Sequence, residues 1–202
     1  MVMEPSTEQH LIEAVKTGDR GALGRLLSEY QYRIYNVVLR MVRHRDDAAD
    51  VTQEVMLKIV EHIDEFQGRS HITTWMIRIA MNLAISHLRQ GRVRAALSLN
   101  GMGTDQGSSG GNVDRHRSLV SHIPDHRELR PDLGVEQKES IALLHRALAK
   151  IDIDFKAVLV LRDIDQMDYQ QVAEVLDVPV GTVKSRLFRA RLALRQQMIR
   201  LT

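Results

Sequence analysis

Residues 168–195 are DYQQVAEVLDVPVGTVKSRLFRARLALR, and this stretch decides the fold of the C-terminal part of the chain. Its pattern predicts two short helices joined by a tight turn. Asp168 stands where an N-cap residue is expected. The apolar face of the first helix is formed by Val172, Ala173, Val175 and Leu176. Residues 177–181 interrupt the pattern, because Pro179 lacks a backbone donor and restricts the residue before it.

The second helix of this pair is expected to begin near Thr182 and is strongly basic. Its apolar stripe consists of Val183, Leu187, Ala190 and Leu194. Its cations lie mostly off that stripe and are Lys184, Arg186, Arg189, Arg191 and Arg195. Residues 180–202 contain six Lys or Arg and no Asp or Glu. This arrangement is typical of a helix-turn-helix, in which one helix braces a second that enters a DNA major groove while its cations meet phosphates.

A plainer interpretation of the same residues is an amphipathic helical hairpin whose basic face is merely solvated. The helix-turn-helix is favoured because the turn, the cap and the one-sided charge coincide in one stretch. A helix-turn-helix indicates DNA binding and little more, so the function depends on the rest of the chain.

Length and composition limit the class of protein. The chain has 202 residues, enough for one or two small domains. Few aromatic residues (4%) beside many Leu, Ala, Val, Ile and Met predict an all-α fold. The lack of cysteine excludes disulfides and thiolate metal sites and suits a reducing compartment. No apolar run approaches the length of a membrane span, and the polar, acidic N-terminal stretch is not a secretory signal, so we expect a cytoplasmic protein.

The N-terminal part begins with two expected helices. The first is capped by Ser6 or Thr7 and ends near Lys16, before Gly18. The second covers residues 19–43. Its apolar positions recur at helical spacing and are Leu23, Leu26, Leu27, Tyr30, Ile34, Val37, Val38 and Met41.

A third helix, from Arg45 to about Ile63, is acidic. The seven acids between residues 45 and 65 are Asp46, Asp47, Asp50, Glu54, Glu61, Asp64 and Glu65. The expected buried stripe is Val51, Val55, Ile59 and Ile63, with Met56 and Val60. The residues expected to face outward or sideways are Asp50, Gln53, Glu54, Leu57 and Lys58. An acidic outer face disfavours phosphate and suits a basic protein partner; a merely solvated face is the alternative.

The sign of the charge then reverses, which the net charge of +2 conceals. Residues 66–104 contain no Asp or Glu, and their arginines are Arg69, Arg78, Arg89, Arg92 and Arg94. Residues 72–90 predict a helix whose apolar side is Trp75, Met76, Ile79, Ala80, Leu83 and Leu88. Thr73 and Thr74 stand at its start, and its polar side carries Asn82, Ser86 and Arg89. Such a strip fits single-stranded or melted nucleic acid, although Trp75 itself suits the core better.

The expected domains are residues 1–92, a flexible basic linker over 93–133, and residues 134–202. Two Gly-rich tracts, at 100–103 and 107–111, disfavour regular structure in the linker. Three histidines follow, at His116, His122 and His126, but without ordered spacing or a completing acid or cysteine we expect no metal site and no cofactor.

The C-terminal domain is expected to contain four helices. One covers residues 134–150, and Asp152 or Asp154 caps the next, which carries Phe155, Val158, Leu159 and Leu161. Residues 163–167 connect it to the helix-turn-helix. The chain is therefore predicted to form two small all-α domains, an N-terminal helical bundle and a four-helix helix-turn-helix domain.

Three stretches together resemble the bacterial extracytoplasmic-function (group IV) sigma factors, two-domain subunits that direct RNA polymerase to promoters. Residues 46–55 are similar to the family's acidic segment that grips the clamp helices of the polymerase largest subunit. Residues 66–84 are similar to the segment that melts and reads the minus-ten element. Residues 161–187 are similar to the reader of the minus-thirty-five element.

The resemblance implies three groups of site residues. Those for polymerase binding are Asp46, Asp47, Asp50, Gln53, Glu54 and Leu57. Those for minus-ten DNA are Arg69, Thr74, Trp75, Arg78, Asn82, Ser86 and Arg89. Those for minus-thirty-five DNA are Thr182, Lys184, Ser185, Arg186 and Arg189.

The resemblance also implies partners, and the sequence departs from the family's pattern in two respects. The partners are core RNA polymerase (clamp helices and flap), promoter DNA and an anti-sigma factor supplied by another chain, with the free protein a monomer and no small-molecule substrate. Asp168 stands where the family commonly has Ser, and both cap helices well. The linker looks long for the family.

Two other functions are the alternatives to a sigma factor. A stand-alone helix-turn-helix regulator would bind palindromic duplex tightly without polymerase. An enzyme has little support, because the sequence shows no paired-carboxylate site, no phosphate-binding Gly loop after a strand and no nucleophile with a placed base.

Overall fold

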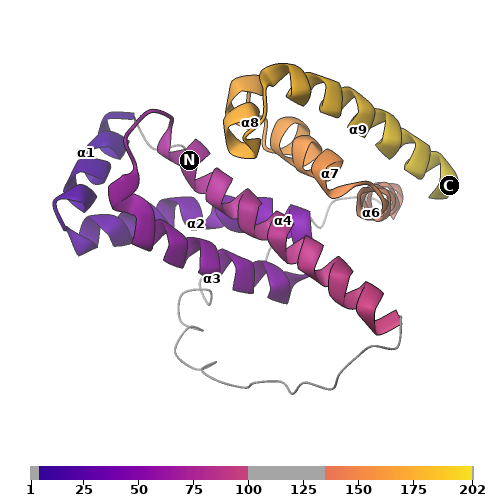
Figure 1. The fold of residues 1–202 in the computed structure, drawn as a ribbon, viewed down its shortest axis with the longest axis horizontal. Helices are drawn as coiled ribbons and strands as arrows, with labels where there is room; N and C mark the ends of the chain where they lie inside the picture. The colour runs from indigo at the N-terminus through magenta and orange to yellow at the C-terminus, as the bar shows by residue number, and fades with distance from the viewer. Residues whose placement is uncertain (1–4, 100–134, 202) are drawn as a thin grey trace. The chain divides into compact units, whose positions relative to one another are not determined.

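The computed structural model describes residues 5–99 and 135–201, and every regular element in these ranges is a helix (Figure 1). The described residues form two compact units, one before and one after the range 100–134. Each unit has its own apolar core. The predicted all-α, two-domain fold is therefore confirmed.

The N-terminal unit contains four α-helices and one short 3-10 turn in the described residues. They are α1 (Pro5–Lys16), α2 (Arg20–Val42), α3 (Arg45–His62), η1 (Ile63–Glu65) and α4 (Ile72–Leu99). Helices α2, α3 and α4 pack against one another, and α1 packs on α2 and η1. The three long helices thus enclose one core.

The boundary between α1 and α2 is set by local chemistry. Gly18 adopts a φ of 91°, which glycine reaches without steric cost, and ends α1. The Asp19 carboxylate then accepts hydrogen bonds from the backbone N–H groups of Gly21 (2.7 Å) and Ala22 (3.1 Å). The expected caps of α1 were wrong, because the helix already begins at Pro5, before Ser6 and Thr7.

The core of this unit comes from the expected apolar positions of α2 and α3, with two corrections. Its fully buried large side chains include Leu26, Ile34, Val37, Val38, Met41, Val55, Ile59, Ile72, Met76, Ile77 and Met81. Val60, which we expected in the buried stripe of α3, is 43% exposed. On α4 the buried side is shifted toward Ile77, Met81 and Ala84, while Ile79 and Leu83 are only half-buried.

Helix α4 is longer than the sequence suggested. It was expected to end near residue 90, followed by a linker from residue 93, but it continues to Leu99. Gly91 does not end it, because one glycine inside a helix costs only about 1 kcal/mol relative to alanine. All residues from Arg89 to Leu97 are exposed, so this end of α4 lies outside the core of the N-terminal unit.

The C-terminal unit contains four α-helices in its described residues, as predicted, with a π-helical turn between the second and third. They are α6 (Val135–Lys150), α7 (Ile153–Leu159), η2 (Val160–Ile164), α8 (Tyr169–Leu176) and α9 (Val180–Leu201). Asp152 caps α7 by accepting from the backbone N–H of Asp154 at 2.8 Å. The long helix α9 packs on α6, α7 and α8 and so organises the unit (Figure 1).

Candidate nucleic-acid interface and partner surface

Helix α8 is fixed at its N-terminus by a reciprocal cap. The Asp168 carboxylate accepts from the Gln171 backbone N–H at 2.8 Å, and the Gln171 side-chain oxygen accepts from the Asp168 backbone N–H at 2.9 Å. Two otherwise unpaired donors of the first turn are thereby satisfied. The predicted cap at Asp168 is confirmed.

The turn between α8 and α9 is as tight as expected. Asp177 ends α8 in the left-handed conformation (φ 53°, ψ 50°), and the Val178 N–H returns to the Ala173 carbonyl at 3.1 Å. Helix α9 begins at Val180, slightly before the expected Thr182. The Pro179 carbonyl accepts from the N–H groups of Thr182 (2.8 Å) and Val183 (3.1 Å), which starts the helix directly after the proline.

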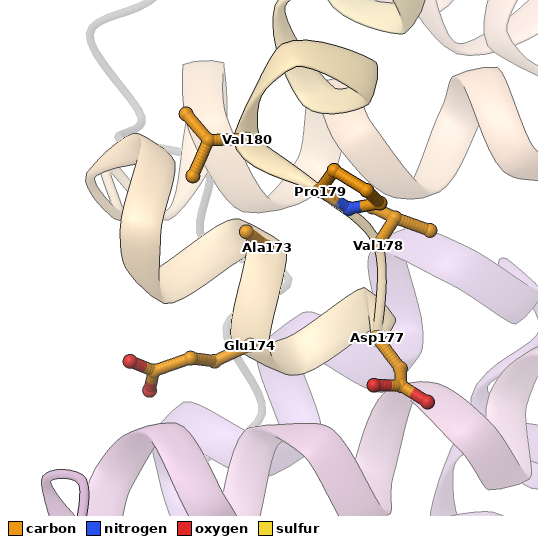
Figure 2. Close-up of a pocket in the computed structure, with 6 residues that line it drawn as sticks. All are labelled: Ala173, Glu174, Asp177, Val178, Pro179 and Val180. Atoms are coloured by element: carbon orange, nitrogen blue, oxygen red, sulfur yellow. The ribbon is translucent and has the colours of Figure 1, made fainter.

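A shallow, open groove of about 390 Å³ lies at this turn. It is lined by Ala173, Glu174, Asp177, Val178, Pro179 and Val180. Figure 2 shows that the two carboxylates point away from Pro179 and from each other. They therefore do not form the paired-carboxylate arrangement that acid–base catalysis requires.

Helix α9 presents the predicted basic face. Val183, Leu187 and Ala190 are buried in the unit. Of the predicted DNA-contact residues, Lys184, Ser185 and Arg189 are exposed, while Thr182 and Arg186 are half-buried. The helix can therefore offer several polar side chains to a groove while its opposite side stays packed.

Phe188 is a candidate site residue that the sequence analysis missed. It lies one helical turn after Lys184 and is 73% exposed, more than any other large apolar side chain in the described residues. An aromatic residue inside a basic helix, away from its apolar stripe, was a signal in the sequence. A side chain of this kind can make apolar contact with a thymine methyl group in a major groove.

Two cations of this unit lie over one aromatic ring. The guanidinium carbon of Arg162 is 4.9 Å from the centroid of Tyr169, and the Nζ of Lys184 is 5.6 Å from it. Arg162 also donates from Nη1 to the Met167 carbonyl at 2.8 Å. The start of α8 is thus connected both to η2 and to α9.

Arg191 faces a different partner. Its Nε donates to Oδ2 of Asp163 at 3.0 Å, and its Nη2 donates to the other carboxylate oxygen. These hydrogen bonds from Arg191 to Asp163 raise the pKa of the arginine. The positive charge of Arg191 is therefore partly compensated within the unit by Asp163, whereas that of Lys184 is not.

In the N-terminal unit, α4 carries the predicted polar strip. Arg78, Asn82, Ser86 and Arg89 are exposed and recur at helical spacing, and Arg69 is exposed in the segment before the helix. Thr74 does not belong to this strip, because it is only 3% exposed and lies inside the bundle. The predicted role of Thr74 as a DNA contact is contradicted by this burial.

Trp75 is half-buried and braced by neighbouring side chains. Its ring lies 5.6 Å from that of Phe66, tilted by 53°. The Nζ of Lys16, at the end of α1, lies 5.7 Å from the Phe66 ring. Trp75 thus packs at the edge of the core and keeps part of its surface beside Arg78 on the exposed strip.

Helix α3 presents an exposed face that carries both acidic and apolar side chains. Asp46, Asp50, Glu54 and Leu57 are exposed at helical spacing, and Leu57 (50%) and Val60 (43%) form an apolar pair within this face. Of the other predicted partner residues, Gln53 is half-buried. Oδ2 of Asp47 lies 3.6 Å from Nε2 of His87 on α4. Acid and exposed apolar surface together suit a protein partner better than a nucleic acid.

Tyr30 connects three helices of the N-terminal unit. It is 8% exposed, and burial raises the pKa of its hydroxyl to about 12. A hydrogen bond with Thr73 of α4 acts in the opposite direction, and the Glu8 carboxylate of α1 raises the pKa further. This hydroxyl helps to fix the start of α4, beside the exposed strip.

Comparison with known families assigns both units. Residues 26–94 match Sigma-70 region 2, and residues 141–194 match Sigma-70, region 4. The chain is therefore a sigma factor, a transcription initiation factor. The alternative of a stand-alone regulator is not favoured, because a region 2 match accompanies the helix-turn-helix.

Full-length relatives define the family further. The chain is 33% identical over 192 residues to the ECF RNA polymerase sigma-E factor of Escherichia coli K12, covering 95% of this chain and 94% of the relative. It is 32% identical to the RNA polymerase sigma-H factor of Pseudomonas aeruginosa PAO1, covering 93% of this chain and 91% of the relative. The protein belongs to the ECF RNA polymerase sigma factors.

Solved structures support the same fold. CnrH, determined in complex with the cytosolic domain of CnrY, gives a TM-score of 0.61 at 19% identity, covering 94% of this chain and 96% of that one. The sigma factor RpoE of Bartonella quintana, determined with the anti-sigma factor NepR, gives 0.59 at 19% identity, covering 87% and 95%. In this protein no helix among the described residues has the length and apolar character needed to cross a membrane.

Proposed function

We propose that this sigma factor binds core RNA polymerase through the acidic face of α3 and reads promoter DNA with two separate surfaces. The contacts to the clamp helices come from Asp46, Asp47, Asp50, Gln53, Glu54 and Leu57. Val60 joins this set because its side chain is exposed on the same face. The flap contacts the C-terminal unit. The observation that carries the proposal is the opposite charge of α3 and α4 within a single bundle.

The two DNA surfaces have different chemistry. On α4 and before it, the minus-ten surface comprises Arg69, Trp75, Arg78, Asn82, Ser86 and Arg89. On α9, the minus-thirty-five surface comprises Thr182, Lys184, Ser185, Arg186, Phe188 and Arg189. A half-exposed ring beside arginine suits unstacked bases of a melted strand, whereas a basic helix suits the major groove of duplex DNA.

An anti-sigma factor supplied by another chain completes the proposal. Support comes from the solved structures of similar fold, of which that of RpoE is a complex with an anti-sigma factor. Such a partner would compete with polymerase if it covers the acidic face. The proposed setting is the cytoplasm, with the free protein a monomer that takes no substrate and no cofactor.

The test is run-off transcription with bacterial core RNA polymerase on a pool of randomised promoter templates, with and without this protein. Protein-dependent transcripts are expected, and the enriched sequences would define both promoter elements. Tight binding to duplex by the protein alone, without any such transcripts, would contradict the proposal.

A charge variant tests the polymerase surface separately. Asp50→Asn combined with Glu54→Gln should weaken binding to core polymerase about three- to tenfold, because two exposed charge contacts are lost. Glu13→Gln, an exposed acid on α1, is the matched control and should bind as the wild type does. Equal retention of all three proteins on immobilised core polymerase would remove α3 from the interface.

A further inference from the structure

The ring of Tyr169 connects three elements that must be arranged correctly for α9 to enter DNA. Tyr169 is the first residue of α8, Arg162 belongs to η2, and Lys184 lies in the first turns of α9. Both cations lie within cation–π distance of this one ring, at 4.9 and 5.6 Å. The ring is thus a common contact for two positive charges.

The ring itself is firmly held. Tyr169 directly follows Asp168, whose reciprocal cap with Gln171 fixes the backbone at this position. Arg162 has a second anchor, the hydrogen bond from Nη1 to the Met167 carbonyl at 2.8 Å. Lys184 has no ion pair within the residues that the structure describes, so the ring is the described contact that restricts its long side chain.

An aromatic ring orders a lysine without removing its charge. A carboxylate partner would compete with phosphate for the same ammonium, as Asp163 does for the guanidinium of Arg191. The face of a tyrosine attracts the cation through its quadrupole and leaves the N–H donors of the lysine available. Of these two cations of α9, Arg191 has its charge compensated by an acid, whereas Lys184 lies over a ring that leaves its charge uncompensated.

We propose that Tyr169 is a positioning residue for promoter binding, whose ring directs the Lys184 ammonium toward a phosphate of the minus-thirty-five element before α9 docks. This inference rests on the proposed function of α9. Pre-ordering the lysine lowers the entropy lost on binding, so the ring acts on affinity through Lys184. The ring is what matters, and the tyrosine hydroxyl is dispensable.

The test measures binding of the polymerase complex containing the full chain to a promoter selected from the randomised pool, over a range of salt concentrations. Tyr169→Leu should weaken binding about two- to fivefold, the size of an exposed cation–π contact. Tyr169→Phe keeps the ring and should bind as the wild type does. A loss of affinity in the Phe variant as large as in the Leu variant would overturn the role of the ring.

A coupling measurement separates positioning from a general structural effect. The effect of Tyr169→Leu should shrink in a Lys184→Met background, because the side chain that the ring positions is gone. It should remain complete in an Arg186→Met background, since Arg186 lies on the same helix but not over the ring. Equal effects of Tyr169→Leu in the two backgrounds would overturn the proposal.

A measurement on the wild-type chain covers the case in which the Leu variant does not fold. The ε-methylene protons of Lys184, assigned by their loss in Lys184→Arg, should show an upfield ring-current shift in NMR spectra. Their appearance at the random-coil position would overturn the inference. Absence of protein-dependent transcripts with wild-type protein would instead contradict the proposed function, whereas active wild type with unaffected Tyr169 variants would contradict the positioning role alone.

Discussion

Arg191 and Asp163, which are 28 residues apart, join α9 to η2 through two parallel hydrogen bonds between guanidinium and carboxylate. The π-helical turn places Asp163 where α9 passes it, and no local pattern connects the two residues. The pair adds a polar contact between α9 and η2 to the buried apolar packing of α9.

The first prediction concerns the stability of this pair. A double-mutant cycle with Arg191→Gln and Asp163→Asn should give a coupling free energy of about 0.5–1 kcal/mol, because the pair is bidentate but partly exposed. Urea denaturation of the four proteins measures it. Arg195→Gln, a cation on the same helix, should show no coupling with Asp163→Asn; coupling of the same size there would mean that the effect is not specific to the pair.

The second prediction concerns the cap of α8. Asp168→Ala should lower the free energy of unfolding of the C-terminal unit by about 1 kcal/mol, since the Gln171 N–H loses its acceptor. Asp168→Ser retains a capping oxygen and should restore most of the loss. A serine variant as unstable as the alanine variant in thermal unfolding would show that the cap is not the cause.

The third prediction concerns pH. The pKa of Tyr30 is raised from 10.0 to about 12 in the folded state. The unfolded chain therefore releases this proton first, and the stabilisation, complete below pH 10, is lost as the pH rises to about 12. The slope in that window is about 1.4 kcal/mol per pH unit.

Absorbance titration of tyrosinate and urea denaturation across the same pH range check this. Tyr30→Phe should remove the high-pH transition and flatten the slope, whereas Tyr32→Phe, at an exposed tyrosine of the same helix, should leave both unchanged. A Tyr30 that titrates near pH 10 would refute the assignment.

The fourth prediction concerns Phe188. Its replacement by alanine should weaken minus-thirty-five binding by on the order of 1 kcal/mol through lost apolar contact. Because no charge is removed, the slope of binding against salt concentration should not change. Leu192→Ala, one turn further along α9 and 49% exposed, is the matched control. Equal losses in both variants would indicate a general effect on the helix.

Features encoded in short stretches were predictable from sequence. The cap at Asp168 and the turn at Pro179 depend on neighbouring residues, so the helices that they delimit were predicted closely. The apolar stripe of α9 is almost uninterrupted, and its buried residues Val183 and Leu187 were identified correctly.

Features that depend on tertiary packing were not predictable. Thr74 was expected to be exposed but is buried, because a small threonine fits inside the bundle. Val60 was expected to be buried but is exposed, because a residue at the flank of a helical stripe can face either way. The helix predicted over residues 72–90 in fact continues to Leu99, because the cost of Gly91 is too small to stop α4. The contacts of Tyr169 and Arg191 join residues too far apart for any spacing rule.

The exposed end of α4 gives the N-terminal unit a rigid arm. Its residues 89–99 rise about 16 Å along the helix axis, at 1.5 Å per residue. The helix therefore ends, at Leu99, at a point displaced from the core of the bundle. Shortening this helix by one turn would move its end by about 5 Å along the axis while keeping its angular position, so the length of α4 sets how far from the bundle the helix ends.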